Sequence, residues 1–187
     1  MSLSLVLEAL REPESFARRW ALERRAPFTL LASLAATASV GVGAYGAAMH
    51  VSQDALAAGQ GGAAAILAAG IAWNASLPSL YVLGSLRGSR LTLQSLALAT
   101  LVTVSFGGVA MLASIPVLWF FELCLPYSAA RLFINAVVFL GVGASMSDVF
   151  IRVMAGLEGR RLLHFAWLGL LGMLGAEMFY VVGLFDL

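Results

Sequence analysis

The residues of this chain with the greatest capacity for chemistry are ionisable groups that interrupt long apolar stretches. Glu122, Arg131 and Glu177 form this set. A charged side chain at the centre of a bilayer costs about 2.5–3.5 kcal/mol on insertion scales, so it usually faces the protein interior and pairs there. We therefore expect Glu177 to face a bundle interior, either protonated or paired with Arg131. Two interpretations stay open: a structural ion pair that includes Glu122, or a protonatable or cation-binding site.

Three further polar residues are candidates for binding. Asn74 lies four residues before Pro78 in an apolar stretch, where it would either hydrogen-bond across helices or line a pore. Pro78 lacks a backbone N–H, which predicts a kink there. His50 and Asp54 follow the first apolar stretch and are candidates for a metal site at its outer mouth, although one imidazole makes a poor ligand set.

The residue inventory excludes most enzyme classes. The chain has no lysine, which rules out a Schiff base and a Walker-A lysine, and Cys124 is its single cysteine. His50 and His164 fall at opposite ends of apolar stretches, so they cannot share one haem. No nucleophile–base set or zinc motif is present, and no basic module would hold nucleic acid. We expect no catalytic residue, no cofactor and no nucleic-acid partner.

The elements that position these residues are apolar runs long enough to cross a membrane. The 187 residues are 61% hydrophobic and 11% charged, outside the usual range of soluble domains. A bilayer core of about 30 Å requires about 20 helical residues. The composition and runs predict an all-α transmembrane bundle of five spans, residues 28–187, after a cytoplasmic segment, residues 1–27. The expected spans are Phe28–His50, Ala63–Leu86, Thr92–Ser114, Ala129–Val149 and Leu162–Leu184.

The arginines give this bundle an orientation. Ten of the eleven basic residues lie before the first span or in the turns after the second and fourth spans, and Arg131 is the exception. By the positive-inside rule the N-terminus is inside and the C-terminus outside. The arginine-, alanine- and glycine-rich composition suggests a bacterial genome, and we expect a multi-pass protein of the inner (plasma) membrane.

Three segments lie between or before the spans. Residues 3–25 read as an amphipathic helix in two pieces, broken near Pro13, either as an interfacial anchor with Trp20 at headgroup depth or as a docking site for a partner. The glycines of Ser52–Gly62 predict a flexible outer loop. The third apolar run is too long for one span, so Pro116 is expected to break it. Val117–Leu125 would then be a short outer interfacial or re-entrant segment.

The layout also resembles a known family. The glycine-containing turn within Leu86–Leu96, the following span with Gln94 that ends near Pro116, and the Tyr45-Gly46 and Leu77–Tyr81 elements carry the resemblance. They are similar to the bacterial branch of the Yip family, which are five-span membrane proteins with a cytosolic N-terminal segment. The trafficking role and soluble domain of eukaryotic members have no counterpart here. The resemblance implies a fold and no functional residues.

Two functional hypotheses follow. Glycine- and alanine-rich faces on the first, fourth and fifth spans exceed what one bundle needs, which predicts a non-enzymatic membrane protein that assembles with itself or in a larger membrane complex. The alternative is a small channel or transporter whose polar pathway includes Asn74, Glu122, Arg131 and Glu177. Apart from the lipid bilayer, the expected partners are therefore other membrane proteins or further copies of the chain.

Overall fold

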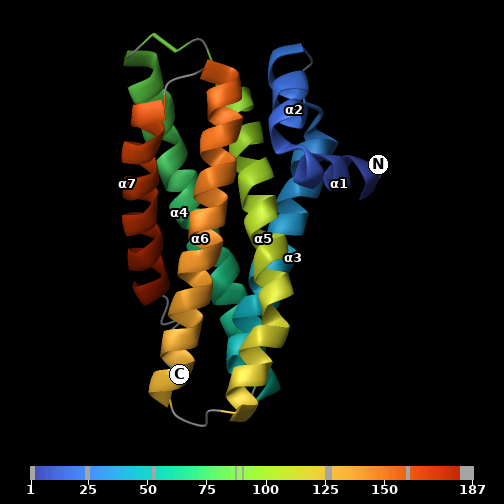
Figure 1. Cartoon of the computed structure of the whole chain (residues 1–187), viewed down its shortest axis with the longest axis vertical. Coiled ribbons are helices and arrows are strands. Elements are labelled where there is room, and N and C mark those ends of the chain that lie inside the picture. The colour runs from blue at the N-terminus through green and yellow to red at the C-terminus, as the bar shows by residue number, and fades with distance from the viewer. Residues whose placement is uncertain are drawn as a thin grey trace.

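A computed structural model shows an all-helical protein in which five long helices run along the molecule and short N-terminal helices pack near one end (Figure 1). The structure describes residues 3–23, 26–51, 54–86, 88–89, 91–124, 128–158 and 161–181, without the side chains of residues 3, 22–23, 122, 128–131, 158 and 161–164. The elements are α1 (Leu3–Arg11), α2 (Pro13–Arg18), the π-helical η1 (Arg19–Glu23), α3 (Phe28–His50), α4 (Ala55–Leu86), α5 (Leu93–Cys124), α6 (Ser128–Glu158) and α7 (Arg161–Val181).

Local sequence explains several helix ends. The carbonyl of Pro27 accepts the first bonds of α3, from the amides of Leu30 and Leu31. The hydroxyl of Thr92 caps α5 by accepting the Ser95 amide at 3.2 Å. After α4 the chain turns at Gly88, whose φ of 78° is a conformation that side chains other than glycine rarely adopt.

The long helices identify a membrane protein. Four stretches of the described residues are long and apolar enough to cross a bilayer: Phe28–His50, Ala55–Leu86, Leu93–Phe121 and Leu132–Leu157. A shorter apolar helix, Phe165–Val181, lies in α7. These five stretches overlap the five predicted spans in the same order, and their bounds differ from the predicted ones by up to eight residues. One end of the bundle holds the N-terminal helices, the end of α4, the start of α5 and the end of α6 (Figure 1). We name it the arginine-rich end.

Close glycine contacts hold α3, α4 and α5 together. A Cβ on Gly41 of α3 would overlap the backbone carbonyl of Gly108 in α5. On the other side of α3, a Cβ on Gly46 would lie 2.6 Å from the Gly61 oxygen of α4. Ser105 adds a link, because its hydroxyl lies 2.7 Å from the Leu34 carbonyl oxygen of α3. Small residues therefore let these backbones touch, as is common in membrane bundles.

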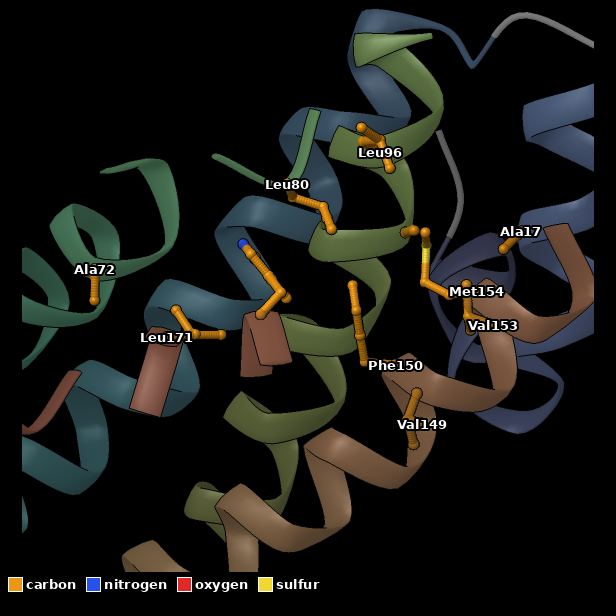
Figure 2. Close-up of a cluster of buried hydrophobic side chains, with 11 residues drawn as sticks. Ala17, Ala72, Leu80, Leu96, Val149, Phe150, Val153, Met154 and Leu171 are labelled. Atoms are coloured by element: carbon orange, nitrogen blue, oxygen red, sulfur yellow. The ribbon is translucent and has the colours of Figure 1, made fainter. Parts of the chain in front are cut away.

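A second core cluster joins α7 to the bundle in the half nearer the arginine-rich end. Figure 2 shows this cluster, in which side chains of α2, α4, α5, α6 and α7 converge. Trp167 of α7 is almost fully buried, stacks on Phe150 at 4.8 Å between ring centroids, and donates its indole N–H to the Ser76 carbonyl at 2.9 Å. This hydrogen bond joins α7 to α4 near Pro78. Helix α4 stays continuous through this proline.

The N-terminal segment packs on its own bundle. Its break at Glu12–Pro13 is confirmed. Phe16 is fully buried against Leu30 and Leu98, and Ala17 packs beside Met154 (Figure 2). Several apolar residues of the segment are thus covered by α3, α5 and α6, whereas Leu7 is exposed, and a position in the membrane interface stays a prediction.

The predicted break after the third span is wrong. Helix α5 continues through Pro116 to Cys124, so the residues from Val117 onward form no separate interfacial or re-entrant element within the described chain. Packing explains the continuity: Leu118 is 1% exposed and shares a cluster with Tyr45 of α3 and Ile134 of α6. A transmembrane helix tolerates a proline when neighbouring helices support the turn around it.

The flexible outer loop is shorter than predicted. Helix α4 already begins at Ala55, one residue after Asp54, whose carboxylate accepts the Ala57 amide at 2.7 Å and caps it. Gly61 and Gly62 are buried in this helix. A Cβ on Gly62 would lie 2.9 Å from the Gly43 oxygen of α3. These glycines therefore serve helix packing rather than loop flexibility, which sequence spacing did not distinguish.

Candidate functional site

An apolar cavity of about 580 Å³ lies where α4, α5, α6 and α7 approach one another. We name it the apolar cavity. Its inner wall includes Ala72, Met111 and Val142, which are all buried. Towards the outside it is bordered by Leu140 of α6 and Gly172 of α7, which are exposed. The cavity therefore opens sideways between α6 and α7. Its opening lies within the apolar stretches of these two helices.

A smaller cavity of about 240 Å³ lies between α3, α4 and α5. Ser39, Asn74 and Thr100 line it, so we name it the threonine cavity. Thr100 is 3% exposed, and its hydroxyl has no hydrogen-bond partner among the described residues. A buried hydroxyl without a partner costs about 1–3 kcal/mol. Sequence reasoning selected Asn74 and missed Thr100, because threonines are common in spans and usually bond to their own helix.

The two cavities are neighbours across a shared wall. Val42, Ala69, Trp73 and Val104 line both of them. Asn74 itself is exposed and donates its amide N–H to the Gly70 carbonyl of its own helix at 2.7 Å. The predicted hydrogen bond from Asn74 to another helix is therefore absent among the described residues, and its side chain satisfies one donor locally.

Glu177 does not face the bundle interior as predicted. It lies on the exposed side of α7, and within the described part of the chain it has no hydrogen bond or ion pair. Its neighbours Ala176 and Phe179 line the apolar cavity, whereas Glu177 does not. The reason is angular: residues that lie one helical position apart point about 100° away from each other, and small residues of α7 occupy the inward face.

The other two members of the predicted set cannot be placed in the same way. The side chains of Glu122 in α5 and Arg131 in α6 lie outside the described residues, so the predicted pairing with Glu177 stays a prediction. One turn beyond Arg131, the structure has a buried polar pair that sequence reasoning missed. Tyr45 donates its hydroxyl to the Asn135 side-chain oxygen at 2.8 Å, and both residues are 1% exposed. An asparagine within an apolar run was the available signal.

His50 and Asp54 have structural partners. His50 is buried, and its Nδ1 donates to the Gly46 carbonyl at 3.0 Å, while Asp54 caps α4. Among the described residues, no three His, Cys, Asp or Glu side chains gather into a group that could hold a metal ion. These contacts account for both residues without a ligand.

Charged residues gather at the arginine-rich end. Arg152 of α6 lies 2.9 Å from Asp148 and 3.5 Å from Glu14 of α2, and Arg19 pairs with Glu8. A polar pocket is lined there by Arg11, Arg18, Arg19, Arg152, Glu12 and Glu14. All the paired groups are at least 39% exposed, so each pair contributes at most about 1 kcal/mol after screening. The pairs orient the N-terminal helices more than they stabilise them.

The comparisons with known proteins add no functional site. No family model, no curated protein and no solved structure matches this chain. The resemblance to the bacterial branch of the Yip family therefore stays a prediction, and the architecture of the site rests on the geometry of this molecule.

Proposed function

We propose that this chain is a non-enzymatic integral membrane protein that assembles, with itself or with another membrane protein, through the outer face of α7. We define this α7 outer face by Gly169, Met173, Glu177 and Tyr180, which are all exposed. The spacing of these residues by three or four positions places them along one side of the helix.

The exposed position of Glu177 carries this proposal. Sixteen residues separate it from Arg161, which corresponds to about 24 Å along the helix and a depth inside a bilayer core of about 30 Å. A carboxyl group on the lipid side at this depth is costly, and such groups normally pair within protein. A neighbouring subunit that covers the α7 outer face would supply such a partner.

The glycines support the same face. Several glycines of α3, α4 and α5 lie against neighbouring helices, as at Gly41 and Gly46. By contrast, a Cβ added to Gly141 of α6 or Gly169 of α7 would meet nothing within 4 Å. No neighbouring helix of the same subunit therefore packs against these two glycines. Small exposed residues in a membrane allow a second helix to approach closely.

Five crossings with the N-terminus inside fit this arrangement. Helix α7 has 21 residues, which rise about 31 Å and match the thickness of a bilayer core. The basic side chains Arg11, Arg18, Arg19 and Arg152 lie at the arginine-rich end. The positive-inside rule makes that end cytoplasmic. An inner-membrane location is the corresponding prediction from the bacterial composition.

The channel or transporter alternative has narrower support. Asn74 lines the threonine cavity, but Glu177 is turned towards the outside of the bundle and lines neither cavity. A continuous polar path between these two residues would require a second subunit. Assembly is therefore the simpler proposal. Conduction of a solute along such a path would also require assembly.

Cysteine cross-linking in the membrane tests the proposal. In a Cys124→Ser background, Met173→Cys places a thiol on the α7 outer face, where Met173 is 74% exposed. Val82→Cys is the matched control, because Val82 is 53% exposed on α4, away from this face. We expect an oxidant to produce a cross-linked band from Met173→Cys and none from Val82→Cys.

The size of the cross-linked product separates the two forms of assembly. A product of twice the subunit mass supports a homo-oligomer, and a product of another mass supports a larger complex. Equal cross-linking at both positions, or none at Met173→Cys together with a monomer in mild detergent, overturns the proposal.

A further inference from the structure

We propose that the apolar cavity is a lipid site that takes one acyl chain of a bilayer phospholipid through the opening between α6 and α7. The inference is independent of assembly, because the cavity lies on the inward side of α7, whereas assembly uses the α7 outer face. Three features of the cavity support the lipid site: its position, the chemistry of its lining and its shape.

The position of the cavity faces lipid rather than water. Its lining residues come from the middle of the long helices, for example Gly108 of α5, Val142 of α6 and Leu171 of α7. The exposed residues at its border, Leu140 and Gly172, belong to the lateral surface of two apolar helices. In a membrane this surface contacts hydrocarbon, so the molecules that reach the opening are lipid chains.

The lining chemistry favours a hydrocarbon over a polar ligand. Of the described lining residues, Ser147 and Trp73 alone have hydrogen-bonding side chains. The Ser147 hydroxyl already donates to the Gly143 carbonyl of its own helix at 2.8 Å. Specific polar ligands are usually oriented by a few converging hydrogen-bonding groups, which this wall does not offer. Aromatic rings of Phe139 and Phe179 contribute further apolar surface.

The shape of the cavity matches an extended chain. On α7 the lining runs from Leu168 to Phe179, a rise of about 16 Å along the helix axis. Acyl chains in a bilayer run in the same general direction, across the plane of the membrane. A volume of about 580 Å³ is within the range of small-ligand sites. A second helix, with a diameter of about 10–12 Å, is too wide to enter and could insert side chains only.

The glycines along the opening keep the cavity accessible. A Cβ added to Gly143, Gly172 or Gly175 would meet nothing within 4 Å, although all three residues line the cavity. These positions therefore leave room that larger side chains would fill. Met111 and Met146 lie on the wall as well, and flexible methionines adapt to chains of different shape.

A pair of glycines on α6 provides the test. Gly143→Leu places a large side chain in the cavity, whereas Gly141→Leu adds the same side chain to the same helix at an open position outside the cavity lining. The purified proteins are incubated with dioleoyl phosphatidylcholine in mild detergent, and native mass spectrometry counts the lipids retained. We expect one lipid on the wild type and on Gly141→Leu. Occupancy of Gly143→Leu should fall more than about tenfold, because its side chain displaces several methylene groups.

The outcome is decided by the difference between the paired variants. Equal retention by Gly141→Leu and Gly143→Leu, or no retained lipid on the wild type, overturns the lipid site. If Gly143→Leu fails to fold, Ala144→Leu, at another residue of α6 that lines the cavity, repeats the comparison with Gly141→Leu. Loss of the lipid with intact Met173→Cys cross-linking shows that the two proposals stand or fall separately.

Discussion

Thr100 and Thr103 are two buried threonines on one helix with different hydrogen bonding. Thr103 donates its hydroxyl to the Ala99 carbonyl at 2.9 Å, while the Thr100 hydroxyl has no partner among the described residues. Thr100→Val removes an unsatisfied polar atom at nearly constant volume, so we expect the free energy of unfolding to rise by about 1 kcal/mol or stay unchanged. Thr103→Val should lower it by about 0.5–1 kcal/mol. Chemical unfolding in detergent measures both changes.

A larger loss in Thr100→Val than in Thr103→Val would contradict this account of the threonine cavity. It would show that a water molecule or a polar ligand bonds to Thr100 in the membrane protein. Such a result would also revive the channel or transporter alternative, because Ser39 and Asn74 line the same cavity.

At the residue scale, the sequence predicted which positions are polar within apolar runs but not where they point. Asn74 does line a cavity, and Glu177 lies in a long apolar helix. The direction of Glu177 depends on which side of α7 contacts α4, and Trp167 decides that through its bond to Ser76. A single sequence does not contain this pairing. The role of Asp54 as a helix cap was predictable only once α4 was known to start beside it.

The N-terminal helices offer the clearest prediction at the scale of elements. Phe16 is fully buried against the bundle, and Phe28 at the start of α3 is 82% exposed. Phe16→Ala should weaken docking of α2 by about 3 kcal/mol, the usual cost of removing a buried aromatic side chain. We expect trypsin cleavage after Arg18 and Arg19 to accelerate roughly a hundredfold, because proteolysis follows the undocked population. Phe28→Ala should leave the cleavage rate nearly unchanged.

Comparable cleavage rates in the two variants would contradict the docked position of α2. The N-terminal segment would then lie in the membrane interface, as its amphipathic pattern alone predicts. The ion pair of Arg152 with Glu14 would not rescue docking, because both side chains are 50% exposed and such pairs contribute little.

The number and order of the long helices followed from the apolar runs, and the errors lie at prolines and glycines. Pro116 was expected to end a helix, but packing of Leu118 against α3 and α6 supports the helix beyond it. Gly61 and Gly62 were expected in a loop, yet they form the contact with α3. The structural role of a proline or a glycine depends on the neighbouring helices, so a single sequence does not determine it.

At the scale of the whole molecule, charge and small residues divide the bundle into regions with different tasks. The arginine-rich end gathers basic side chains together with the N-terminal helices. Helices α3, α4 and α5 use several of their glycines for close packing, while a Cβ at the glycines of α6 and α7 would meet nothing within 4 Å. Three of these open glycines, Gly143, Gly172 and Gly175, line the apolar cavity. Helices α3, α4 and α5 form the closely packed part of the bundle. The side formed by α6 and α7 can contact lipid or a partner subunit.

The orientation of this bundle in the membrane is the claim on which the rest depends, and thiol labelling tests it most directly. Gly59 and Gly156 are exposed at opposite ends of the bundle, and a Cβ added at either would meet nothing within 4 Å. In a Cys124→Ser background, an impermeant maleimide should label Gly59→Cys in intact cells and Gly156→Cys only after permeabilisation. Labelling of Gly156→Cys in intact cells, with Gly59→Cys protected, would contradict the orientation and the membrane topology built on it.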